Sequence, residues 1–328
     1  MKNIQADIKS GNFKQVYLLY GEEAYLKQQY KQNLVKALDP DGDTMNFNHY
    51  EGKGIDVKQL IDLCETMPFF AERRVVLLED TGFFKNKCEE LADYMKELPD
   101  YLYLVFAETE VDKRNRMYKA VKACGSIAEF IRQDEKILMR WAAGILGKAG
   151  KKITQRDMEL LLTKTGTDMG NLRMEMEKLI SYTEGRDVVT AEDIEEICTT
   201  QTTNRIFDMV RAVTEKNQKR ALELYYDLLT LKEPPMRILF LLAKQYRQLL
   251  LAKQFAAAGL AQTEIASKLG VPGFVVKNIT TCARAYTISE LEQAVKDFVD
   301  AEESVKTGRL EDKLSVELLI IKYSSKVK

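Results

Sequence analysis

The turn after the first apolar run is where an α/β protein would carry a phosphate-binding loop. Residues Val16 to Tyr20 are followed there by Gly21-Glu22-Glu23-Ala24-Tyr25-Leu26-Lys27. A phosphate loop needs a second glycine and a Lys-Ser/Thr pair, because backbone amides cradle the phosphates while the lysine reaches the terminal ones. Neither is present, and two carboxylates stand where phosphates would bind. The sequence therefore predicts no functional phosphate loop and no cofactor.

Catalytic and metal-binding patterns are also weak. The pair Glu79-Asp80 ends an apolar run, like the acidic pair that holds Mg²⁺ in phosphate-loop ATPases, but here it has no phosphates to neutralise. His49 is the only histidine, so acid–base or nucleophilic catalysis built on histidine is not expected. The five cysteines show neither a close pair nor a metal-binding spacing. We expect no catalytic residues and no metal site.

The segment Met67-Pro68-Phe69-Phe70 is a candidate for protein binding. It follows an amphipathic stretch, and Pro68 is expected to stop that helix because its ring cannot continue the preceding backbone geometry. Two adjacent aromatic side chains in a tight bend cannot easily both point inward. Bulky apolar groups at a helix end are suited to filling a partner's pocket. Taken alone, the segment leaves burial of both rings in the core as the alternative.

A second candidate, residues 262–279, resembles a helix-turn-helix. The first helix and the turn match well, but the second helix begins Pro272-Gly273-Phe274 and offers few side chains for base edges, chiefly Lys277 and Asn278. The pattern favours a packed pair of helices, with sequence-specific DNA reading as the alternative.

The elements that would position these residues fall into three groups. Short β-branched or aromatic runs alternate with helical stretches as far as Arg132, which is typical of a mainly parallel sheet with covering helices. Five strands are predicted at Val16 to Tyr20, Met45 to Tyr50, Val75 to Glu79, Leu102 to Ala107 and Ser126 to Ile131. Helices are predicted between them near Glu22 to Leu38, Val57 to Thr66, Asn86 to Glu97 and Lys113 to Ala123.

After Asp134 only helices are expected, with Thr154 and Thr190 as N-caps. The predicted domains are therefore an α/β domain over residues 1–134, a small helical domain over 135–203 and a C-terminal helical bundle over 204–328.

The charge of the chain is nearly balanced, with 49 Lys and Arg against 50 Asp and Glu. This argues against binding nucleic acid or anionic membrane through bulk charge. From Asn204 onward there are 20 basic and 15 acidic residues, against 29 and 35 before it. No secretory signal and no apolar run long enough for a membrane span are present, so an intracellular, soluble protein is expected.

Taken together, several short segments resemble the delta-subunit family of the bacterial DNA polymerase III clamp loader. Each is weak alone, and their order and spacing along nearly the whole chain carry the resemblance. They are Val16 to Gly21, Met67 to Leu78, Asp112-Lys113-Arg114, Gly170-Asn171-Leu172 with Glu177-Lys178-Leu179, and Asp300 with Lys306-Thr307-Gly308.

The resemblance implies an AAA+ module, formed by an α/β domain and a helical lid, followed by a helical collar. It implies a subunit of a hetero-pentameric ring that loads the sliding clamp (beta) onto primed DNA, within a DNA-directed DNA polymerase (nucleotidyltransferase) holoenzyme. Such a subunit is a cytoplasmic, nucleoid-associated bacterial protein that neither binds nor hydrolyses ATP. Its clamp-binding apolar pair falls on Phe69 and Phe70, supported by Met67 and Pro68, although Pro68-Phe69 departs from the Ser-Leu-Phe form.

Two other functions stay open on the sequence. One is a nucleotide-dependent AAA+ ATPase or switch with a degenerate loop around Gly21, and the other is a helix-turn-helix DNA-binding regulator using residues 262–279.

Overall fold

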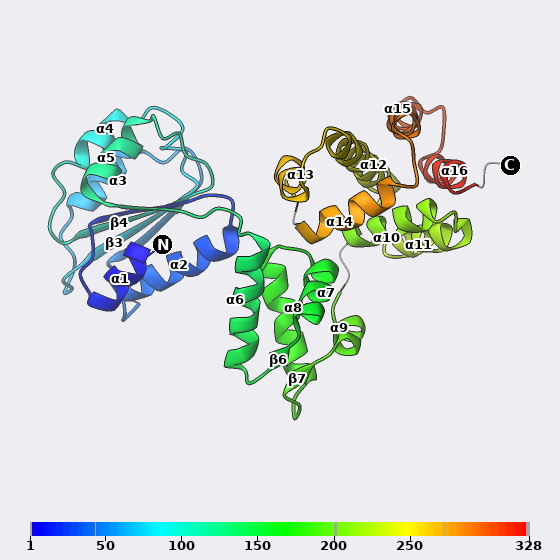
Figure 1. Ribbon diagram of the computed structural model, residues 1–328. Coiled ribbons are helices and arrows are strands. Elements are labelled where there is room, and N and C mark those ends of the chain that lie inside the picture. The colour runs from blue at the N-terminus through cyan, green and yellow to red at the C-terminus, as the bar shows by residue number, and fades with distance from the viewer. Residues whose placement is uncertain (1, 43, 200–201, 272, 326–328) are drawn as a thin grey trace. The chain divides into compact units, whose positions relative to one another are not determined.

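The computed structural model describes residues 2–42, 44–199, 202–271 and 273–325 (Figure 1). The chain forms two compact units, Met1–Gln133 and Asp134–Lys328. The first unit contains the sheet, and the second is built almost entirely of helices.

The sheet of the first unit has five parallel strands in the order β2-β3-β4-β1-β5. The strands are β1 Val16–Tyr20, β2 Phe47–Glu51, β3 Arg74–Glu79, β4 Leu102–Glu108 and β5 Ser126–Glu129. Their predicted ends differ from these by at most two residues. Parallel strands covered on both faces read as continuous apolar runs, which is why β1, β3 and β4 were visible in the sequence.

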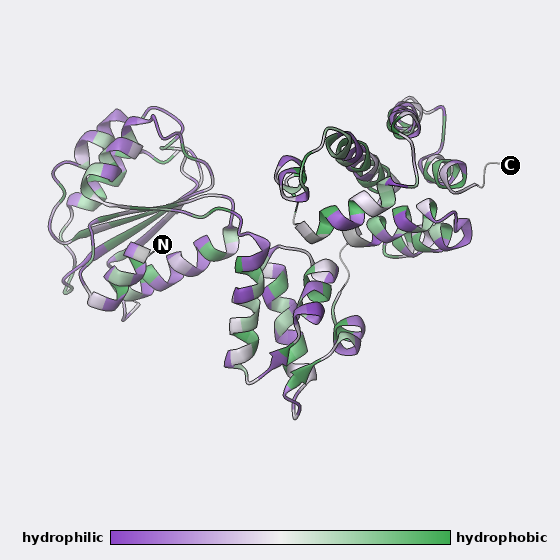
Figure 2. Ribbon diagram, viewed as in Figure 1, coloured by the Kyte–Doolittle hydropathy of each residue, from purple (hydrophilic) through white to green (hydrophobic). Residues whose placement is uncertain are grey.

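Helices cover both faces of this sheet (Figure 1). On one face lie α1 Lys2–Ser10 and α2 Ala24–Leu38, and on the other lie α3 Val57–Glu65, α4 Glu89–Tyr94 and α5 Arg116–Cys124. Alternate residues of a strand point to opposite faces, so Val16 and Leu18 pack with the α3–α5 layer while Tyr17 and Leu19 pack with the α1–α2 layer. Figure 2 shows the strands as the most hydrophobic part of this unit.

Two features of the first unit differ from the prediction. The sequence did not indicate α1, whose one fully buried apolar side chain, Ile4, is too little for a helical pattern to stand out. Helix α4 is shorter than the predicted stretch 86–97, because residues 80–88 pass through turns before it.

The second unit begins with α6 Glu135–Lys148, α7 Gln155–Thr165, α8 Met169–Tyr182 and α9 Ala191–Ile197. Thr154 and Thr190 are the N-caps of α7 and α9, as predicted. The expectation that no strand follows Asp134 is wrong, because β6 Lys152–Ile153 and β7 Val188–Val189 pair in parallel. Two-residue strands are too short to produce a periodic sequence signal.

The remaining helices have a hydrophobic core of their own. They are α10 Thr202–Thr214, α11 Gln218–Thr230, α12 Pro235–Ala257, α13 Gln262–Leu269, α14 Gly273–Ala283, α15 Ile288–Lys306 and α16 Asp312–Ser324. Their core draws on residues 206–320, whereas the core of α6–α9 draws on residues 142–198. The separate cores support the proposed boundary near residue 203, which stays a prediction.

Candidate functional site

An apolar loop, residues 66–73, joins α3 to β3 and carries the predicted protein-binding segment. Helix α3 begins at an Asp56 cap, whose carboxylate accepts the backbone N–H groups of Lys58 and Gln59. It ends at Thr66, whose hydroxyl donates to the carbonyl of Asp62 at 2.9 Å. Pro68 follows two residues later, so the helix stops where the sequence predicted.

The apolar loop exposes the side chains that the sequence singled out. Met67 is 74% exposed, Phe69 57% and Phe70 94%, while Pro68 is half-buried. The two phenylalanine rings meet edge to face with their centroids 4.5 Å apart. Phe70 also has a positive φ of 51°, unusual for a bulky side chain, which turns the chain between the two rings. The alternative of two core residues is therefore wrong.

Two buried polar side chains hold the backbone of the apolar loop. Asn46 donates through Nδ2 to the carbonyl of Phe69 at 2.8 Å and accepts the Phe69 N–H at Oδ1 at 2.7 Å. Arg74 donates to the carbonyls of Thr66 at 2.8 Å and Met67 at 3.3 Å. Neither role was predicted from the sequence, and no local pattern marks Asn46, which lies 23 positions before Phe69.

The turn after β1 is closed by the protein itself. The carbonyl of Phe130 accepts the Glu23 N–H at 3.0 Å, and the Phe130 N–H donates to the carbonyl of Tyr20 at 2.7 Å. Gly21 has φ +127°, and a Cβ there would lie 2.3 Å from the Phe130 oxygen. The backbone at the start of α2 thus bonds to the chain after β5, which supports the prediction that this turn is not a phosphate loop.

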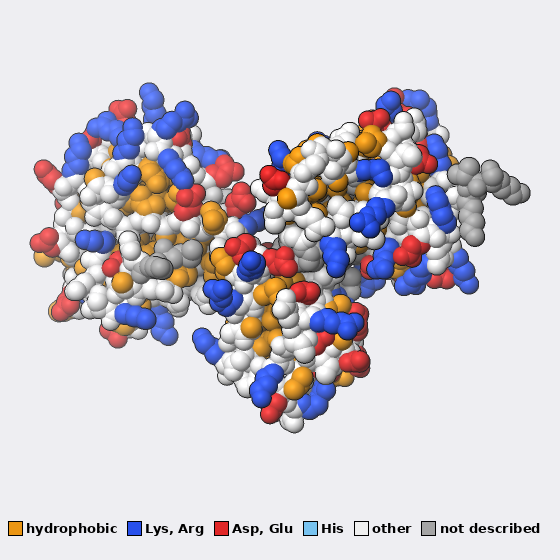
Figure 3. All heavy atoms as spheres, viewed as in Figure 1, with side chains coloured by type: hydrophobic (Ala, Val, Ile, Leu, Met, Phe, Trp, Pro, Cys, Tyr) orange, Lys and Arg blue, Asp and Glu red, His pale blue; other side chains and the backbone are white. Residues whose placement is uncertain are grey.

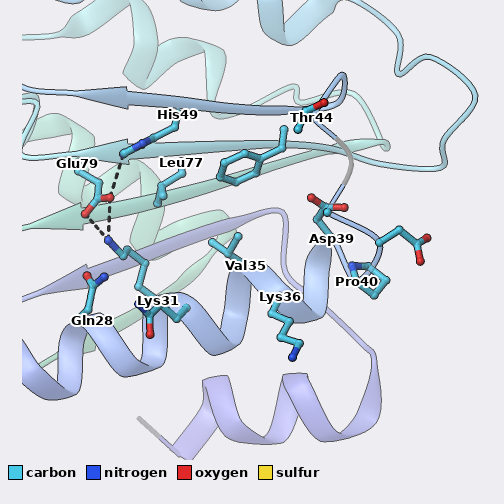
Figure 4. Close-up of a pocket in the computed structure, with 14 residues that line it drawn as sticks. Gln28, Lys31, Val35, Lys36, Asp39, Pro40, Thr44, His49, Leu77 and Glu79 are labelled. Carbon is cyan, nitrogen blue, oxygen red and sulfur yellow. Dashed lines mark hydrogen bonds and ion pairs between the residues drawn. The ribbon is translucent and has the colours of Figure 1, made fainter.

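A cavity of about 600 Å³ lies between α2, strands β2 and β3 and the loop after α2 (Figure 4). At one end, Lys31 Nζ lies 2.7 and 2.6 Å from the two oxygens of Glu79, and His49 Nε2 lies 2.9 Å from Oε1 of the same carboxylate. The adjacent Asp80 accepts the N–H and hydroxyl of Thr109. Both members of the acidic pair are thus engaged by protein donors, and the sole histidine of the sequence contacts the Glu79 carboxylate.

Glu108 and Lys27, near the carboxyl edge of the sheet, have shifted pKa values. Burial raises the pKa of Glu108, although hydrogen bonds from Thr81 and Gly82 oppose the shift. Burial lowers the pKa of Lys27, whose Nζ donates to the Glu108 carbonyl at 2.9 Å. These contacts tie α2 to the ends of β3 and β4. Among the described residues, no group of three or more His, Cys, Asp or Glu is arranged to hold a metal ion.

The helix-turn-helix candidate is a packed pair of helices. Helix α13 ends at Gly270, whose φ of +64° makes the turn towards α14. Ile265, Val276 and Ile279 are buried in the core of the C-terminal helices, while Lys277 and Asn278 are exposed. Pro272 and the side chain of Phe274 lie outside the part of the chain that the structure describes. Most apolar side chains of this pair thus serve the core.

The surface and the helix lengths add two general observations. Acidic and basic side chains are intermixed over each unit on the face drawn in Figure 3. Within the described residues, no helix combines the length and the apolar character that crossing a membrane requires.

Comparisons with known proteins come from both sequence and structure. Two family models match: "DNA polymerase III, delta subunit" over residues 17–130 and "DNA polymerase III delta subunit, C-terminal domain" over residues 203–323. DNA polymerase III subunit delta of Bacillus subtilis is 26% identical over 331 residues, which covers 97% of this chain and 95% of the relative. The probable DNA polymerase III subunit delta of Aquifex aeolicus is 22% identical, covering 80% of this chain and 77% of the relative.

Among solved structures, the Bacillus subtilis DNA clamp loader delta protein (YqeN) superposes with a TM-score of 0.68 at 24% identity, covering 99% of both chains. This likeness confirms the predicted fold class, an α/β unit with a parallel five-stranded sheet followed by helices.

Proposed function

The chain belongs to the DNA polymerase III delta-subunit family, and we propose that it binds the sliding clamp and helps open it for loading onto primed DNA during replication. It is thus a component of the polymerase III clamp-loading complex. The apolar loop, with Phe69, Phe70, Met67 and Pro68, is the proposed clamp-binding site. Neither the nucleotide switch nor the DNA-reading regulator is favoured by these relationships.

The observation that carries this proposal is the exposure of two adjacent aromatic side chains on a loop whose backbone is held in place. Phe70 is 94% and Phe69 57% exposed, although water contact is unfavourable for both rings. Exposed apolar groups of this kind mark surfaces that a partner covers. A pocket on the clamp that received both rings would remove them from water and recover that free energy.

The proposed mechanism is a shift of a conformational equilibrium. Binding opens the clamp only if the loop binds the open conformation more tightly than the closed one, because a ligand shifts an equilibrium by its differential affinity. The subunit needs no catalysis of its own for this step. ATP-driven rearrangement of neighbouring subunits would expose or cover the loop.

The same proposal includes the partners, the roles of the domains and the location in the cell. The partners are the sliding clamp (beta), the other clamp-loader subunits of a hetero-pentameric ring, and primed DNA held by the assembly. Residues 1–134 and 135–203 form the AAA+ module and its lid, and residues 204–328 form the collar, which contacts neighbouring subunits. We place the protein in the bacterial cytoplasm, associated with the nucleoid.

The direct test is a pull-down of the cognate sliding clamp with the full-length chain. The wild type should retain the clamp, and Phe69→Ala/Phe70→Ala should lose it. Phe240→Ala is a matched control, because this phenylalanine of α12 is 64% exposed and belongs to the other unit. Equal retention of the clamp by wild type and double variant would show that the clamp-binding assignment is wrong.

A nucleotide titration tests the absence of ATPase function. Calorimetry of the isolated chain with Mg²⁺ and ATP should show no binding heat, because the turn at Gly21 is bonded to Phe130. Micromolar ATP binding would instead favour the nucleotide-dependent switch.

A further inference from the structure

The backbone of the apolar loop is attached to the sheet by a buried asparagine. The side-chain amide of Asn46 forms both bonds with one residue, donating to the Phe69 carbonyl and accepting the Phe69 N–H. An Asn side chain carries a donor and an acceptor side by side, so it can pair with a backbone N–H and C=O as a β-ladder residue would. Ala, Ser or Asp in its ionised form cannot make both bonds.

Asn46 is itself fixed by its position in the fold. It directly precedes β2, is 3% exposed, and its carbonyl accepts the N–H of Val75 in β3 at 2.9 Å. A hydrogen bond to such a buried group is not easily exchanged for one to water. The two bonds to Phe69 therefore tie the apolar loop to the edge of the sheet.

Arg74 holds the other end of the same loop. The side chain of this first residue of β3 is buried, and its guanidinium reaches the carbonyls of Thr66 and Met67 as well as Oδ1 of Asn48 at 3.1 Å. A cation at the last carbonyls of α3 also matches the negative end of the helix dipole. The loop is thus held at its start by Arg74 and at Phe69 by Asn46.

These bonds from Asn46 and Arg74 to the loop all end on backbone atoms. They do not involve the side chains of Met67, Phe69 or Phe70, which stay exposed. A loop that is fixed through its backbone and left free in its side chains already presents its apolar groups before any partner arrives. Ordering such a loop on binding would otherwise cost affinity.

We propose that Asn46, with Arg74, is a positioning residue that preorganises the apolar loop for the clamp. This inference rests on the proposed clamp-binding function. Asn46 contacts no clamp atom in this scheme, and acts only through the backbone of the loop.

Hydrogen exchange in the free full-length protein tests the positioning directly. The Phe69 amide should exchange slowly in the wild type, because its N–H donates to the side-chain oxygen of Asn46. In Asn46→Ala it should exchange about 2- to 12-fold faster, as expected for the loss of one hydrogen bond. Affinity for the purified sliding clamp should fall by about 5- to 30-fold in the same variant, as expected for losing one or two neutral hydrogen bonds that hold the bound conformation.

Asn115→Ala is the matched control. This asparagine of the same unit also uses its amide in both directions, accepting the Met117 N–H at 2.9 Å and donating to the Asn86 carbonyl at 2.9 Å. Its loss removes comparable bonds without touching the apolar loop. Asn115→Ala should therefore lower the melting temperature but leave clamp affinity and the exchange of Phe69 unchanged.

A double-mutant cycle separates positioning from general damage. On the Phe69→Ala/Phe70→Ala background, adding Asn46→Ala should lower the residual clamp affinity by less than about 2-fold, since the rings it positions are gone. If Asn46→Ala does not fold, Arg74→Lys takes its place. A lysine cannot reach the carbonyls of Thr66 and Met67 and Oδ1 of Asn48 at the same time, as Arg74 does.

The outcomes distinguish this inference from the function it rests on. If Phe69→Ala/Phe70→Ala binds the clamp like wild type, the clamp-binding assignment fails. If that variant loses the clamp while the Asn46 variant keeps both full affinity and a protected Phe69 amide, only the positioning inference is overturned. An equal loss of affinity in Asn115→Ala would also overturn it.

Discussion

The exposure of the two phenylalanine rings predicts unequal losses of clamp affinity for their single substitutions. Complete burial of a phenylalanine side chain is worth about 1.5–3 kcal/mol. Scaled by the 94% and 57% of each residue that is exposed, the available gain is about 1.4–2.8 kcal/mol for Phe70 and about 0.9–1.7 kcal/mol for Phe69. Phe70→Ala should then weaken clamp binding by about 10- to 100-fold and Phe69→Ala by about 5- to 20-fold.

These values treat the backbone of the loop as already ordered. Asn46 and Arg74 hold it in the free protein, so only the two rings lose freedom on binding. For the same reason Phe70→Ala should change the free energy of unfolding by less than about 0.5 kcal/mol, as expected for a surface side chain. Affinity and stability therefore separate cleanly for this residue.

The assay is calorimetry or surface plasmon resonance with immobilised clamp, together with urea unfolding of each variant. Phe240→Ala serves as the control for removing an exposed phenylalanine, and should keep wild-type affinity. A larger loss of clamp affinity in Phe69→Ala than in Phe70→Ala would contradict this ranking by exposure. An equal loss of folding stability in Phe70→Ala would contradict it as well.

Three further predictions concern stability and reactivity. Gly21→Ala should lower the melting temperature, because φ is +127° and an added Cβ would lie 2.3 Å from a carbonyl oxygen, so the backbone must move. Gly144→Ala, in an open stretch of α6, should instead raise the free energy of unfolding by about 0.5–1 kcal/mol. Mass mapping after brief treatment with iodoacetamide at pH 8 should find Cys124 modified before Cys64, because Cys124 is exposed while burial raises the pKa of the Cys64 thiol to about 12; faster modification of Cys64 would contradict its burial. Burial raises the pKa of Asp193, but hydrogen bonds at the start of α9 and from a guanidinium outweigh it and lower the pKa overall. The Asp193 carboxylate therefore stabilises the fold above about pH 4, and this contribution is lost at lower pH. In urea unfolding, the destabilisation by Asp193→Asn should be largest near neutral pH and shrink as the pH falls below about 4.

Much of the first unit could be predicted because its signals are local. Buried parallel strands produce continuous apolar runs, and the turn after β1 shows directly that a second glycine and a Lys-Ser/Thr pair are missing. The α3 boundary also followed from neighbouring residues, since Pro68 limits the helix, whereas the local pattern at Phe69 and Phe70 left their burial in the core as an alternative.

The elements and the residue role that the sequence did not predict share a physical cause. Helix α1 and strands β6 and β7 are short elements that depend on contacts with distant segments, as in the parallel pairing of Lys152–Ile153 with Val188–Val189. The role of Asn46 depends on the order of the sheet, because β2 lies beside β3 and so brings residue 46 to the loop before β3. No periodic pattern along the chain indicates which strand lies beside β3.

The sequence by itself determined two properties on which the proposed clamp binding rests. One is an α/β unit without a phosphate loop, and the other is a pair of adjacent aromatic side chains after a helix. Those properties depend on residue type and on spacing over a few positions. Only the tertiary structure decided that Phe69 and Phe70 face solvent, that Glu79 is engaged by Lys31 and His49, and that the apolar loop is held through its backbone. Exposure and hydrogen bonding are properties of the surrounding space, which the folded chain fills with residues far apart in the sequence.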